Sequence, residues 1–74
     1  MDNRDALIGN ILRKYRMEDG RSIQYVADKI GKTKSAVAYW ENGARSINMS
    51  DVLDIVTKMG YDRERFVKDI MDIL

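Results

Sequence analysis

The sequence of 74 residues contains no cysteine, no histidine and no proline. Without cysteine, neither a disulfide nor a thiolate metal site is available. The lack of histidine removes the commonest metal ligand and the commonest general base. No apolar run approaches the roughly 20 residues that a membrane-spanning helix needs. We therefore expect a chain with no metal, no cofactor, no small-molecule ligand and no membrane partner, and a cytoplasmic location fits the lack of cysteine.

Features of an enzyme are equally scarce. There is no glycine-rich loop of the kind that holds phosphate, and the neighbouring acids Glu18-Asp19 and Asp62/Glu64 fall in a turn and at a helix start. The net charge is only +1, but it is unevenly distributed. Residues 1–48 carry nine Lys/Arg against six Asp/Glu, whereas residues 49–74 carry four against six. A basic front and an acidic back would orient a small protein on a polyanion such as DNA.

Glycines divide the chain into apolar-periodic segments. Gly20, Gly31, Gly43 and Gly60 each follow such a segment, where a left-handed residue ends a helix. Strand-like alternation is missing. The sequence therefore predicts one all-α domain over residues 1–74, a compact five-helix bundle. Its expected helices cover about 4–18, 22–30, 33–41, 48–59 and 62–74, and the last four begin at Ser22, Thr33, Asn48 and Asp62.

The stretch 22–43 is the most informative part of the sequence. It reads as two short helices that meet at Gly31, the residue type best suited to a tight turn. The small Ala27 permits the second helix to approach the first closely. Val37 and Trp40, three residues apart, place one apolar edge against the first helix, so Trp40 is expected in the core. The outer face of the second helix is then free to enter a DNA major groove, as in a helix-turn-helix.

The order of these residues resembles the Xre/Cro-like helix-turn-helix family of phage and bacterial repressors. The match runs from Ile8 to Gly60. Its elements are Ile8-Gly9, Ile11-Leu12, Arg16, Ser22, Val26-Ala27, Ile30-Gly31, Thr33, Ser35, Val37, Glu41-Asn42-Gly43 and Leu53…Met59-Gly60. The resemblance implies a lambda repressor-like domain that binds a twofold-symmetric operator in double-stranded DNA, usually as a dimer.

By this resemblance the helix over 33–41 is the recognition helix. Its positions that match base-facing residues of the family are Thr33, Lys34, Ser35, Ala38 and Tyr39. Lysine donates to guanine, serine donates or accepts at several base edges, and a tyrosine ring packs on a thymine methyl. The alternative is that Lys34, Ser35 and Tyr39 form the solvated face of an amphipathic helix.

A second set of side chains is suited to the DNA phosphates. This set comprises Ser22, Gln24, Asn42, Arg45, Ser46 and Asn48. Two departures from the family pattern weaken the expected affinity. Ile23 stands where the family usually has a glutamine that contacts DNA, and Ile47 stands where proline is frequent.

Arg16 and Glu41 match a pair that is typically a structural salt bridge in the family. This bridge would join the ends of the first and third helices and fix the angle of the recognition helix. We assign the pair to structure before function.

The last predicted helix carries two apolar stripes. Phe66, Ile70 and Ile73 form the first, which a small domain can bury. The second, made of Val67, Met71 and Leu74, predicts a homodimer interface. Two alternatives remain open: the second stripe packs on the first helix, or the chain is the N-terminal part of a longer repressor.

Together these features predict a sequence-specific regulator of transcription. The most concrete form is a phage- or mobile-element-type repressor that acts as a dimer on an inverted repeat. The alternative is a protein-interaction module on the same scaffold, an antitoxin or an antirepressor partner that uses the helix over 62–74.

Overall fold

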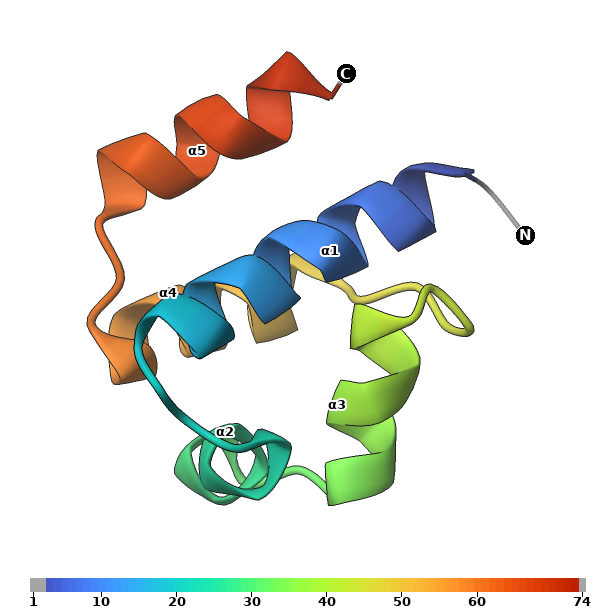
Figure 1. Cartoon of the computed structure of the whole chain (residues 1–74), viewed down its shortest axis with the longest axis vertical. Helices are drawn as coiled ribbons and strands as arrows, with labels where there is room; N and C mark the ends of the chain where they lie inside the picture. The colour runs from blue at the N-terminus through green and yellow to red at the C-terminus, as the bar shows by residue number, and fades with distance from the viewer. Residues whose placement is uncertain (1–2, 74) are drawn as a thin grey trace.

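The structure, a computed structural model, describes residues 3–73 and contains five helices in this range (Figure 1). They are α1 (Asn3–Glu18), α2 (Ile23–Ile30), α3 (Lys34–Glu41), α4 (Met49–Met59) and α5 (Arg63–Asp72). No strand occurs in the described range, so the predicted all-α five-helix architecture is confirmed. The last helix ends at Asp72, two residues before its predicted end, and Leu74 lies outside the described residues.

Each of the last four helices is preceded by the predicted cap residue. The side-chain oxygens of Ser22, Thr33, Asn48 and Asp62 accept a hydrogen bond from the backbone N–H three residues later, over 2.8 to 3.1 Å. These bonds satisfy N–H groups that have no partner within the helix. At the other end, Gly31 closes α2 with φ at 69°, a left-handed conformation that other residues resist. Local sequence therefore accounts for where the helices begin and where α2 stops.

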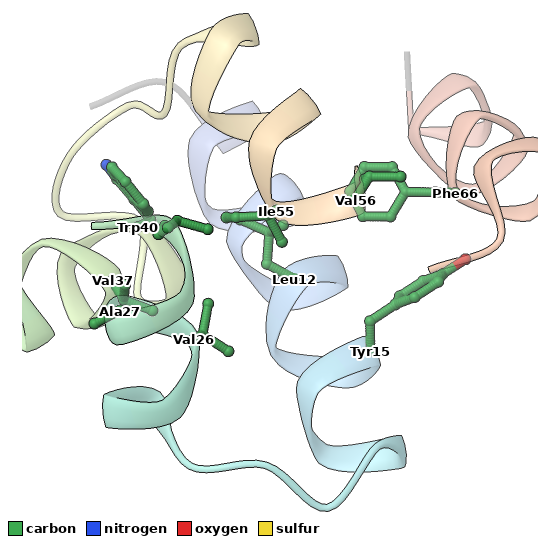
Figure 2. Packing of buried hydrophobic residues seen from close by; sticks show 10 residues of the cluster. Leu12, Tyr15, Val26, Ala27, Val37, Trp40, Ile55, Val56 and Phe66 are labelled. Atoms are coloured by element: carbon green, nitrogen blue, oxygen red, sulfur yellow. The ribbon is translucent and has the colours of Figure 1, made fainter. Parts of the chain in front are cut away.

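The core contains one to three buried apolar side chains from every helix (Figure 2). Ala27 is completely buried where α2 meets α3, which explains why a small residue is needed there. Trp40 is only 7 % exposed, so its predicted place in the core is confirmed. The other buried apolar residues are Leu12, Tyr15, Val26, Ile30, Val37, Ile55, Val56 and Phe66.

Helix α1 approaches the end of α3 so closely that two glycines are required. A Cβ atom added to Gly9 would lie 2.1 Å from the carbonyl oxygen of Trp40 and 2.7 Å from that of Glu41. A Cβ atom added to Gly43 would lie 2.8 Å from the Cα atom of Ala6. The N-terminal half of α1 is thus held in a fixed position against the α3–α4 loop.

Helix α5 lies at one edge of the bundle, beside α1 (Figure 1). Phe66 is its only buried residue, and the Phe66 ring packs edge-on against Tyr15, with ring centroids 5.1 Å apart. Ile70 is half-buried and also packs against the core, and polar contacts add to the attachment to α1. The Tyr15 hydroxyl donates to Asp69 Oδ2 over 2.6 Å, and Arg65 pairs with Glu18 at 3.0 Å.

The two tyrosines near this contact predict a loss of stability at high pH. Burial, followed by the hydrogen bond to Asp69, raises the pKa of Tyr15 to about 12, and burial also raises the pKa of Tyr61 to about 12. A folded-state pKa above the unfolded value of about 10 favours folding below pH 10, and this contribution disappears as pH rises to about 12. We expect the stability advantage of the wild type over Tyr15→Phe to shrink across this interval. Urea unfolding at several pH values measures it, and a constant difference would contradict the assignment.

Candidate nucleic-acid interface

Four of the five predicted base-facing side chains, which lie on α3 and on its cap residue Thr33, are exposed to solvent. Thr33, Lys34, Ser35 and Tyr39 are exposed, whereas Ala38 is half-buried. The opposite side of α3 is anchored in the core through Val37 and Trp40 (Figure 2). Lys34 has no ion-pair partner within residues 3–73, so its ammonium group is available to an external acceptor.

Arg45 extends this surface beyond the end of α3. Its guanidinium carbon lies 4.7 Å from the centre of the Tyr39 ring, and the N–H groups of Ala44 and Arg45 both donate to the Tyr39 carbonyl oxygen. The stacking keeps the guanidinium group beside α3, with its N–H groups free to bind an anion.

The six predicted phosphate contacts differ in how far they are engaged within the protein. Arg45 is exposed, and among the residues that the structure describes its side chain contacts only the Tyr39 ring. The oxygens of Ser22 and Asn48 cap helices, and Asn42 Oδ1 accepts from the N–H of Ala44 over 2.8 Å. Gln24 donates to Asp28 over 2.8 Å, and Ser46 donates to Asp5 over 2.6 Å. The serine and asparagine that act as caps keep their donor groups for an outside ligand, whereas the Ser46 proton is already used.

Arg16 and Glu41 form a bidentate ion pair at the junction of α1 and α3. Nε and Nη2 of Arg16 donate to the two carboxylate oxygens of Glu41 over 2.7 and 2.9 Å. The side chains are only 13 % and 7 % exposed. These hydrogen bonds raise the pKa of Arg16 further above its ordinary value. A third bond, from Nη1 to the carbonyl oxygen of Arg21, extends the pair to the α1–α2 turn. The end of α3 is therefore tied to two other parts of the chain.

Sequence reasoning did not find three polar contacts around this surface. Asp5 accepts a hydrogen bond from the Ser46 hydroxyl, and the buried Asp51 of α4 pairs at 3.7 Å with Lys32 of the α2–α3 turn. In addition, the guanidinium group of Arg21 lies 4.4 Å from the ring centre of Tyr25. The first two contacts join residues far apart in the chain, and no local spacing signals them.

Comparison with known proteins identifies the family. The profile of the helix-turn-helix family HTH_3 matches residues 12–66, which is more than half of the chain. The chain belongs to the helix-turn-helix family. The resemblance to Xre/Cro-like proteins is thereby confirmed, and this helix-turn-helix protein is a DNA-binding protein of the kind that regulates transcription, a function that needs no catalytic site.

A solved structure shares the whole arrangement of helices. The crystal structure of the clp gene regulator ClgR from C. glutamicum superimposes with a TM-score of 0.85, over 100% of this chain and 96% of that chain. The two sequences are only 12% identical, so this similarity shows that the folds are the same and nothing about function. A comparison with curated proteins finds no match. Within residues 3–73, no helix has the length and apolar character needed to cross a membrane.

Proposed function

We propose that this chain is a sequence-specific repressor of the phage or mobile-element type, which binds an inverted-repeat operator as a homodimer in the cytoplasm. The observation that carries the proposal is the exposed face of α3. Lys34, Ser35 and Tyr39 share this face, while the opposite face is fixed in the core and by the Arg16–Glu41 pair. A helix that is anchored to the protein through one face and carries hydrogen-bond donors on the other is suited to contacting base edges in a major groove.

In this proposal the exposed face of α3 contributes the base contacts and the flanking residues hold the backbone. Lys34 and Ser35 reach base edges, Tyr39 packs its ring on a thymine methyl, and Thr33 and Ala38 complete the contact surface. The phosphates are bound by Arg45, by the side chains of Ser22, Gln24, Asn42, Ser46 and Asn48, and by the free N–H groups of the first turn of α2.

The dimer interface is proposed at the apolar face of α5. Val67 and Met71 are 58 % and 61 % exposed, and Leu74, the third predicted residue, lies outside the described range. Val67 and Met71 border an apolar groove of about 370 Å³. This groove extends to α4, where Met49 and Leu53 are 67 % and 56 % exposed. Protruding side chains beside an apolar hollow suit a twofold contact, in which each copy fills the groove of the other. A stable interface needs about 800 Å² from each copy, which α5 with α4 supplies better than α5 alone.

A lysine at Met71 should break the proposed dimer. An ammonium group placed in an apolar interface loses its hydration, so we expect Met71→Lys to raise the dimer dissociation constant roughly tenfold or more. Because Met71 is mostly exposed in the single chain, the helix content should not change. Analytical ultracentrifugation across a concentration series measures the mass, with Asp72→Lys as a control on the same helix. A wild type that stays monomeric throughout would contradict the interface.

Loss of Lys34 and loss of Arg45 should have different signatures. Lys34→Ala should cost about 1–3 kcal/mol on the preferred operator and much less on unrelated DNA. Arg45→Ala should weaken binding to all sequences and reduce the slope of log K against log salt by about 0.9. Fluorescence anisotropy at several salt concentrations separates the two effects. Equal losses on every sequence for Lys34→Ala would remove that residue from the base-reading set.

Selection of binding sites from random double-stranded DNA tests the function as a whole. Enrichment of an inverted repeat by the purified chain would support the dimeric repressor. Enrichment of a single half-site would retain sequence-specific DNA binding and argue against a stable dimer. If the folded protein enriches no sequence, the groove between α4 and α5 favours the second candidate, in which this chain is a protein-interaction module, an antitoxin or an antirepressor partner, that uses α5.

A further inference from the structure

An acidic side chain of α1 lies beside the proposed phosphate-binding loop, residues 44–48. Asp5 belongs to the first turn of α1, 41 residues before its partner, yet its Oδ2 atom accepts the Ser46 hydroxyl over 2.6 Å. Residues 44–48 contain a single basic residue, Arg45. The loop expected to hold a DNA phosphate therefore combines one cation with one neighbouring anion.

The backbone packing of α1 fixes Asp5 in this place. The next residue, Ala6, lies against Gly43: a Cβ atom added to Gly43 would be 2.8 Å from the Cα atom of Ala6. One turn further along α1, Gly9 lies directly on the carbonyl oxygens of Trp40 and Glu41. Two close approaches hold the start of α1 against the α3–α4 loop. The carboxylate of Asp5 is thus a built part of this surface, unlike a long side chain that could swing away.

The chemistry of this contact opposes phosphate binding in two ways. A serine hydroxyl has one proton, so Ser46 cannot donate to a phosphate while it donates to Asp5. The carboxylate also repels the phosphate and offsets the charge of Arg45. We propose that Asp5 limits the affinity of this protein for DNA by occupying Ser46 and by placing a negative charge beside the backbone of the operator. This inference rests on the proposed function and adds a residue that sets how tightly the protein holds its site.

A purely structural role for Asp5 predicts the reverse. An acid in the first turn of a helix stabilises that helix, and the bond to Ser46 fastens the loop that carries Arg45. If this fastening were what mattered, removal of Asp5 would loosen the loop and weaken DNA binding. The two interpretations therefore differ in the sign of the effect.

The test compares Asp5→Asn and Asp5→Ala with the wild type on the selected operator and on unrelated DNA. The first variant removes the charge, and the second also removes the acceptor for Ser46. We expect both to bind both DNAs roughly 3- to 10-fold more tightly at low salt, with a smaller gain at high salt. Asp72→Asn on α5 makes the same change in net charge away from the loop and should have a much smaller effect. Adding Ser46→Ala to Asp5→Ala should remove part of the gain.

An unfolded variant would bind DNA more weakly, so a gain in affinity cannot result from unfolding. Thermal melts show whether each variant is folded. Unchanged or weaker binding by both folded variants would overturn the inference while leaving the proposed function intact. An equal gain from Asp72→Asn would also overturn it, because net charge alone would then explain the effect. If neither the wild type nor the variants bind any DNA, the proposed function and this inference both fail.

Discussion

Glu41→Ala should lower the free energy of unfolding by several kcal/mol. The substitution removes both carboxylate oxygens from Arg16, whose side chain is only 13 % exposed and has little access to water. An uncompensated charge in such a place costs about 3–5 kcal/mol. Domains have about 0.05–0.15 kcal/mol of stability per residue, which gives about 4–11 kcal/mol for 74 residues, so this loss is a substantial part of the total. Urea unfolding followed by circular dichroism measures the change.

The charge-swapped double variant is the sharper test of the same pair. Arg16→Glu combined with Glu41→Arg should be more stable than either single variant, because the opposite charges meet again. Recovery should be incomplete, since the bond from Arg16 to the carbonyl oxygen of Arg21 is lost. Glu18→Ala provides the control: its bridge to Arg65 is about half exposed and should contribute no more than about 1 kcal/mol. A double variant no more stable than the singles would show that the pairing itself contributes little.

Gly9→Ala should destabilise the protein by about 3 kcal/mol, although alanine normally stabilises a helix relative to glycine by about 0.5–1 kcal/mol. The added Cβ atom would lie 2.1 Å from the carbonyl oxygen of Trp40. This oxygen belongs to the backbone of α3, so relief requires the two helices to separate. The sign of the effect is therefore opposite to that expected from helix propensity.

Asn10→Ala is the matched control for this prediction. Asn10 is the next residue of α1 and is exposed, so alanine should be neutral or slightly stabilising there. Thermal or urea unfolding of the two variants, measured in parallel, isolates the destabilisation caused by the clash of the added Cβ atom with α3. Should Gly9→Ala prove as stable as Asn10→Ala, the close approach of α1 to α3 would be wrong.

The features predicted correctly from the sequence depend on short spacings. Ser22, Thr33, Asn48 and Asp62 cap their helices within three residues, so local chemistry suffices to locate them. Trp40 follows from its helical spacing to Val37. Arg16 and Glu41 are distant in the chain, and only the resemblance to a known family brought them together.

Contacts between distant residues could not be predicted in the same way. Tyr15 and Asp69 are 54 positions apart, and Asp5 and Ser46 are 41 apart. Their pairing depends on how α1 packs against α5 and against the α3–α4 loop. The same limit applies to the phosphate contacts. The sequence shows that Gln24 and Ser46 are able to donate hydrogen bonds, but not that Asp28 and Asp5 already accept them.

The weak attachment of α5 has a consequence for cooperativity. Because Phe66 is the only buried residue of α5, we expect a lower free energy of local opening for α5 than for the four helices that share the rest of the core. Its backbone amides should exchange with solvent before those of α1–α4. In the proposed dimer, a second copy binds only chains in which α5 is docked, so association itself shifts the local equilibrium of this helix. A rise in protein concentration would then increase both the fraction of chains with α5 docked and the occupancy of the operator. The occupancy would rise more steeply with concentration than for a dimer whose α5 is always docked.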